Sequence, residues 1–77
     1  MNPEEVIKLR HHIKLVMQEF SERWDEAGLS PHEKHVTMCS ALSFNLAEYV
    51  IKNNPTSTPE SFGEICATSF RIVSRGT

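Results

Sequence analysis

Apolar residues recur at spacings of three and four along the first third of the chain. The stripe that they form consists of Val6, Leu9, Ile13, Val16, Met17, Phe20 and Trp24. On a helix of 3.6 residues per turn, all of them fall within about 60° of the direction of Ile13. Pro3 suits a first helical turn, and Gly28 is typical of a position just beyond a helix end. The pattern predicts a helix over about residues 3–26, with Trp24 as a core residue near its end.

A second helix begins at an explicit start signal. Ser30, Pro31 and Glu33 have the spacing of a capping box. In this motif the Ser hydroxyl caps the helix, and the Glu carboxylate accepts a hydrogen bond from the backbone N–H of the Ser. The pattern stops before Pro55, because a residue that precedes proline disfavours helical geometry. These signals predict a helix over about residues 31–52.

This second helix is apolar on nearly all sides. One stripe consists of His35, Met38, Cys39, Leu42, Leu46, Tyr49 and Val50, and a second group on the opposite side consists of Val36, Phe44, Ala47 and Ile51. The 13 residues from His35 to Ala47 include no Lys, Arg, Asp or Glu. Because such a helix must be covered on both sides, we expect it to be the central element of the fold.

A third helix is predicted over about residues 59–74. Thr58 is a suitable cap, Pro59 takes the first position, and Gly76 is expected to end the helix. Its apolar stripe consists of Phe62, Cys66, Phe70 and Val73, flanked by Ile65 and Ile72. No strand pattern interrupts the three helices, so the expected fold class is all-α, with one helical domain over residues 1–77.

The small size of the chain favours an oligomer. For 77 residues, the free energy gained by burying apolar surface is about as large as the conformational entropy lost on folding. Two cysteines cannot form a disulfide framework, so no obvious covalent link tips this balance. We therefore expect a homodimeric helical bundle, in which helix 3 packs either within its own chain or across the dimer.

Composition excludes several classes of protein. Hydrophobic residues make up 39% and charged residues 23%, with a formal net charge of −2, which is typical of a globular domain rather than a disordered one. No run of about 18 apolar residues exists, and the N-terminus lacks the features of a secretory signal. We expect a cytoplasmic protein without membrane contact. The short chain also suggests a bacterial or phage source, an assignment that rests on size alone.

His32, His35 and Cys39 are the candidate metal ligands. Their spacing places them on one face of the second helix, and imidazole and thiolate groups bind zinc, copper or nickel. Two or three further ligands would have to converge from other helices, from among His11, His12 and Cys66. The alternative is that all three have structural roles, with Cys39 as a small core hydrophobe. We favour this alternative and expect no metal or cofactor.

Neither catalysis nor nucleic-acid binding is favoured. Cys39 lies in the most apolar segment, where a thiol is not activated, and no motif of a hydrolase or nucleotide-binding enzyme is present. The run from Ala27 to Ser30 resembles the turn of a helix-turn-helix motif over about ten residues. However, Trp24 and Lys34 stand where that motif has a small and an apolar residue. The second helix also lacks basic residues for a DNA groove.

The pattern as a whole predicts a non-enzymatic protein–protein interaction or regulatory module that acts as a homodimer. A small nucleic-acid-associated regulator is the alternative, and a metal-binding protein is a further one. The expected interface with a second copy or a protein partner consists of Val36, Leu42, Phe44, Ala47 and Ile51.

Overall fold

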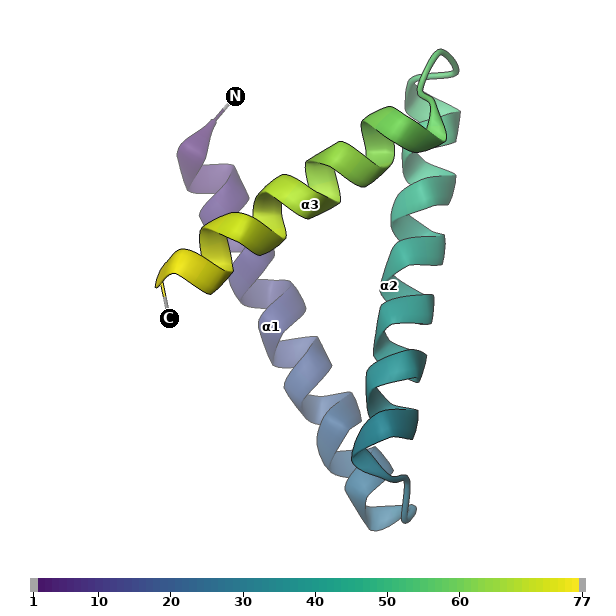
Figure 1. Cartoon of the computed structure of the whole chain (residues 1–77). Helices are drawn as coiled ribbons and strands as arrows, with labels where there is room; N and C mark the ends of the chain where they lie inside the picture. Colours follow the sequence, from purple (N-terminus) through teal and green to yellow (C-terminus); the bar gives the residue numbers. More distant parts are fainter. Residues whose placement is uncertain (1, 77) are drawn as a thin grey trace. The chain divides into compact units, whose positions relative to one another are not determined.

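The computed structural model describes residues 2–76 and confirms three helices. They are α1 (Pro3–Glu26), α2 (Pro31–Asn53) and α3 (Pro59–Gly76), and no strand occurs within residues 2–76 (Figure 1). α2 ends one residue later than predicted, and α3 ends two residues later. The described part of α3 extends to Gly76, the residue that was expected to end it. Gly28 alone among the described glycines has a positive φ, so Gly76 does not adopt the left-handed conformation of a helix-ending glycine.

The chain divides into two units, Met1–Ala41 and Leu42–Thr77. The first unit contains α1 and the first half of α2, and the second contains the rest of α2 together with α3. Each unit is therefore a pair of helical segments joined by a short turn.

The turn of the first unit is a Schellman motif. Gly28, with a φ of 82°, follows the last residues of α1. Its N–H donates to the carbonyl of Asp25 at 3.1 Å, and the N–H of Leu29 donates to the carbonyl of Trp24 at 2.9 Å. These two bonds satisfy carbonyl groups that the end of a helix leaves unpaired. The predicted stop at Gly28 is confirmed.

The predicted capping box at the start of α2 is also confirmed. The backbone N–H of Glu33 donates to Ser30 Oγ at 3.1 Å, and the N–H of Ser30 donates to Glu33 Oε1 at 3.0 Å. The hydrogen bond from the Ser30 backbone lowers the pKa of the Glu33 carboxyl from its ordinary value of 4.5. The first helix has a comparable cap that the sequence analysis missed, since Asn2 Oδ1 accepts from the backbone N–H groups of Glu4 and Glu5.

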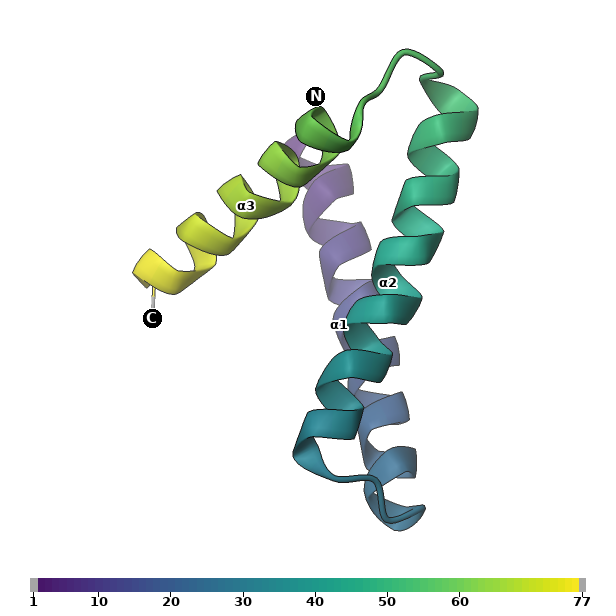
Figure 2. The same ribbon diagram turned by 45° about the vertical axis from the view of Figure 1, so that its right-hand side comes forward.

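In the second unit a tight turn connects α2 to α3 (Figure 2). The N–H of Ser57 donates to the carbonyl of Asn54 at 3.0 Å, with Pro55 at the second position of the turn. Thr58 caps α3 as predicted, because its Oγ1 accepts from the N–H of Ser61 at 3.1 Å. The hydrogen bonding is reciprocal, because Ser61 Oγ accepts from the N–H of Thr58 at 3.0 Å.

None of the residues 2–76 is fully buried. The half-buried ones are Met17, Ser21, Trp24, Leu29, Lys34, Met38, Ala47, Val50, Ser57, Phe62 and Ala67. A pair of helices shields only the side chains between them, so two-helix units leave the remaining apolar faces in water. α2 has no buried residue in the single chain, and its central place in a homodimer stays a prediction.

The conformation of Gly28 predicts opposite effects for two Gly→Ala substitutions. Gly28→Ala should lower the free energy of unfolding by about 1 kcal/mol, because an L residue is strained at a φ of 82°. Gly63→Ala in α3 should raise it by about 0.5–1 kcal/mol, because alanine is the better helix former. An added Cβ meets open space at both positions, so the two substitutions differ only in the backbone conformation of the glycine that they replace. Denaturant unfolding at one protein concentration tests this, and equal effects would contradict it.

The capping box predicts a pH-dependent contribution to stability. A carboxyl whose pKa is lowered on folding stabilises the fold above its unfolded pKa, and that contribution is lost as the pH falls through the folded value. Wild type should therefore be more stable than Glu33→Gln at pH 7, and the two should converge below the ordinary value of 4.5. Glutamine keeps the hydrogen-bond acceptor, so only the charge is removed. A difference in thermal midpoint that does not change between pH 7 and pH 3 would refute this role.

Candidate interaction surfaces

In the first unit, α1 and α2 face each other across a hollow of about 420 Å³ near their turn. Met17, Ser21 and Trp24 line it from α1, and Pro31, Lys34, His35, Met38 and Cys39 line it from α2. Trp24 is half-buried here, and its ring centroid lies 5.9 Å from that of Phe20. The guanidinium of Arg23 lies 5.0 Å from the Phe20 ring centre, in cation–π geometry. The stripe of His35 and Cys39 is thus the side of α2 that meets α1 in this unit.

An ion pair joins the two helices of the first unit. Lys34 Nζ lies 2.7 Å from Asp25 Oδ1, and the Lys34 side chain is only 24% exposed. The Lys34 stem lines the hollow beside Trp24, while its ammonium group reaches the carboxylate at the end of α1. The sequence analysis noted Lys34 only as a departure from the helix-turn-helix pattern. The pair depends on the conformation of the Gly28 turn, which sequence spacing does not reveal.

The three candidate metal ligands are not assembled into a site. His35 and Cys39 line the hollow of the first unit, whereas His32 does not, and all three are exposed. Within residues 2–76, no three His, Cys, Asp or Glu side chains lie close enough together to hold a metal ion. In the first unit, His11 and His12 of α1 therefore do not complete a ligand set with these residues.

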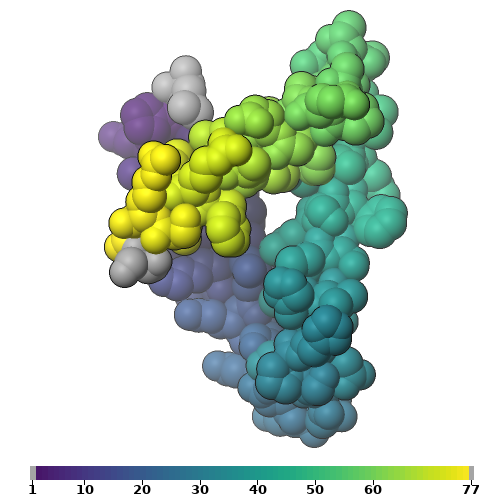
Figure 3. All heavy atoms as spheres, viewed as in Figure 1, coloured from purple at the N-terminus to yellow at the C-terminus, as the bar shows by residue number. Residues whose placement is uncertain are grey.

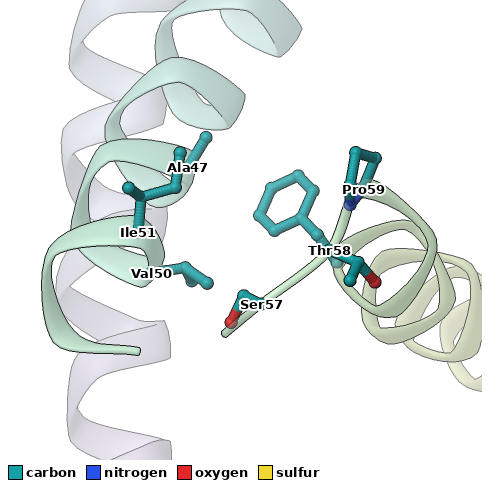
Figure 4. Close-up of a pocket in the computed structure, with 7 residues that line it drawn as sticks. Ala47, Val50, Ile51, Ser57, Thr58 and Pro59 are labelled. Carbon is teal, nitrogen blue, oxygen red and sulfur yellow. The ribbon is translucent and has the colours of Figure 1, made fainter. Parts of the chain in front are cut away.

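In the second unit, the start of α3 lies against the end of α2. Ala47, Val50 and Ile51 line one side of a hollow of about 250 Å³, and Ser57, Thr58 and Pro59 line the other (Figure 4). Phe62, from the first turn of α3, completes the lining and is half-buried. Beyond this point the axes of the two helical segments diverge (Figures 1 and 2). The first turn of α3 thus covers Ala47 and Val50, but little else of α2.

The large side chains of the predicted interface are exposed in the single chain. In the second unit, Leu42 is 39%, Phe44 71% and Ile51 65% exposed, whereas Ala47 is half-buried beside α3. Val36, which lies in the first unit, is 47% exposed. Their role as an interface stays a prediction.

Further exposed apolar residues of the second unit were not predicted as interface. Leu46 and Tyr49 of α2 are 44% and 66% exposed, and the sequence analysis placed them in an apolar stripe of this helix but not in the interface. Most of the apolar stripe of α3 is also exposed, and its members are Ile65, Phe70, Ile72 and Val73. Periodicity marked both stripes as apolar, but it could not indicate how far along each helix the intrachain packing extends.

The charged groups of α3 lie on the opposite side of that helix. On a helical wheel, Glu64, Arg71 and Arg75 are turned away from the stripe that contains Ile65 and Val73. Arg71 Nη1 lies 3.1 Å from Glu64 Oε1, so this pair is neutralised within the helix. The exposed apolar stripe of α3 is consequently free of charge along its length. Figure 3 draws the side chains of α3 as spheres, in colours that run from green to yellow.

Among the helices of residues 2–76, none combines the length and apolar character that crossing a bilayer requires.

The Lys34–Asp25 pair predicts a small, salt-sensitive contribution to stability. Asp25→Asn should lower the free energy of unfolding by up to about 1 kcal/mol at low ionic strength, and the loss should shrink in about 1 M NaCl. Glu5→Gln is the control, because it breaks an ion pair with Lys8 in which both side chains are mostly exposed. A loss at Asp25 that salt leaves unchanged, or an equal loss at Glu5, would contradict this assignment.

The chain was compared with protein-family models, with curated proteins and with solved structures, and nothing matches it in any of the three comparisons. The two helix pairs and the apolar side chains that they leave exposed are therefore the observations that bear on function.

Proposed function

We propose that the protein is a non-enzymatic protein–protein interaction or regulatory module that acts as a homodimer. One observation carries this proposal: large apolar side chains of α2 are exposed in the single chain. Phe44 is 71% and Ile51 65% exposed, and in the same unit the start of α3 is capped by Thr58 and Ser61. Exposed apolar surface contributes to stability only when it is removed from water, and a contiguous patch of this kind is typical of an interaction site.

The charge distribution on α2 supports a second copy as the covering partner. Residues 42–47 include no charged side chain. In a dimer with twofold symmetry, each copy presents the same patch to the other. Two copies of an uncharged patch can pack together without like-charge repulsion. The polar residues that follow the patch can lie at the rim of the interface. The interface of the proposed dimer consists of Leu42, Phe44, Ala47 and Ile51 of the second unit, with Val36 of the first as an additional contact.

The proposal extends to the setting in which the protein acts. Cys39 and Cys66 are both free thiols, as expected in the reducing cytoplasm. We place the protein in the cytoplasm and regard it as being of bacterial or phage type. We expect the homodimer to act through contacts, with a further protein as the target of regulation.

Light scattering on two charge variants tests the proposed dimer. At tens of micromolar, wild type should have twice the 8.8 kDa mass of a single chain. Phe44→Glu should reduce this mass by half, because a carboxylate in an apolar interface loses its hydration without gaining a partner. Asn45→Glu is the matched control, since it introduces the same charge one residue away on the polar side of α2 and should leave the dimer intact.

Two outcomes would contradict the proposal. A wild-type chain that scatters as a monomer at these concentrations would exclude the homodimer. Equal dissociation by Phe44→Glu and Asn45→Glu would show that added charge alone, rather than loss of the apolar patch, separates the copies.

A further inference from the structure

We propose that the hollow of the first unit is a binding site for a single copper(I) ion. Its ligands are four of the side chains that line the hollow, Met17 of α1 and His35, Met38 and Cys39 of α2. The proposal departs from the sequence-based expectation of no metal, because the ligand set considered there, with His32, contained no methionine. It does not depend on the proposed homodimer, since all four side chains belong to one unit of one chain.

The chemistry of the donor atoms is the first argument. Thiolate and thioether sulfur atoms are soft ligands that select copper(I), and imidazole also binds copper. His35 and Cys39 alone supply two donors, whereas a structural zinc site needs four from Cys, His, Asp or Glu. Met17 and Met38 add two thioethers, a donor type that is absent from zinc sites. None of the described residues that line the hollow is Asp or Glu, so it offers no carboxylate to magnesium or calcium.

The placement of the donors on the two helices is the second argument. His35, Met38 and Cys39 are three and four residues apart, so they lie on one face of α2. Met17 lines the same hollow from α1. The two methionines are half-buried, and an unbranched methionine side chain has three rotatable bonds. Both thioethers can therefore turn toward an ion that enters the hollow, without a change in the backbone.

Charge balance is the third argument, and it favours a monovalent ion. A thiolate at Cys39 carries one negative charge, whereas a neutral imidazole and two thioethers carry none. Copper(I) bound by this set is neutral overall. A divalent ion would leave an uncompensated positive charge beside the apolar ring of Trp24. Lys34 also lines the hollow, but its ammonium group lies 2.7 Å from Asp25 Oδ1 and is paired there.

Binding exchanges a proton for the metal ion. Copper(I) displaces the proton of the Cys39 thiol, which passes to water, and no electron is transferred. The ion enters already reduced, under conditions that also keep Cys39 a free thiol. Because the ligands come from α1 and from α2, the bound ion links the two helices of the unit and stabilises it.

An anaerobic titration with copper(I), in competition with the chromogenic chelator bicinchoninate, tests this inference. Wild type should withdraw one copper(I) ion per chain from the chelator. Groups that only orient metal ligands contribute about 10–100-fold to affinity, so His35→Gln, which removes a ligand, should weaken binding at least about tenfold. His32→Gln is the matched control and should leave the affinity unchanged, because His32 does not line the hollow. Met38→Leu should also weaken binding at least about tenfold, and leucine keeps the volume of the side chain.

Three results of this titration would overturn the inference. The first is a wild-type chain that withdraws no copper(I) from the chelator. The second is an equal loss of affinity in His35→Gln and His32→Gln. The third is full affinity in a chain that carries both Met17→Leu and Met38→Leu, because copper(I) would then be held without the thioethers.

X-ray absorption at the copper edge uses the unmodified chain, in case a variant fails to fold. The copper(I)-loaded protein should show a first shell dominated by sulfur, with one nitrogen ligand. A shell of nitrogen and oxygen alone would overturn the inference, as would a second copper atom nearby, which indicates a cluster bridged by thiolates. Light scattering reports on the homodimer separately, so a failure of the copper site and a failure of the proposed function are distinguishable.

Discussion

Two helical segments can shield only the side chains that lie between them, and this constraint governs both units of the protein. In the first unit, α1 and α2 share the strip around Trp24 and Met38. In the second, α2 and α3 share a shorter strip around Phe62. Apolar residues elsewhere on these helices stay in water, so none of the residues 2–76 is fully buried. The proposed homodimer follows from this deficit, because a stable fold of this size needs more buried apolar surface than two such strips supply.

The helices themselves could be predicted because their signals are local. The reciprocal bonds between Ser30 and Glu33 and the left-handed Gly28 are each determined by a few neighbouring residues. These groups satisfy the unpaired backbone atoms at helix ends, which is a requirement that sequence alone reveals. Gly76 differs from Gly28, because it is the last residue of α3 and does not have a positive φ. A glycine permits the left-handed conformation but does not impose it.

The exposed surfaces were less predictable because they depend on how far each helix pair stays in contact. Periodicity identified the stripe of Phe62, Phe70 and Val73 as apolar, but only Phe62 is half-buried. Leu46 and Tyr49 likewise belong to an apolar stripe of the second helix, and both are exposed in the single chain. Where two helices separate is set by their crossing geometry and by the turn between them. Neither can be derived from spacing along one helix.

In the proposed homodimer, the stability of the fold depends on a second copy. Thermal unfolding over a range of protein concentrations tests this dependence most directly. When folding is coupled to dimerisation, the midpoint rises with concentration by mass action. We predict an increase of several degrees between about 1 and 100 µM, with a single cooperative transition throughout. A midpoint that is the same at every concentration would mean that the single chain is stable by itself. It would contradict the proposal that the exposed apolar side chains of α2 are covered by another copy.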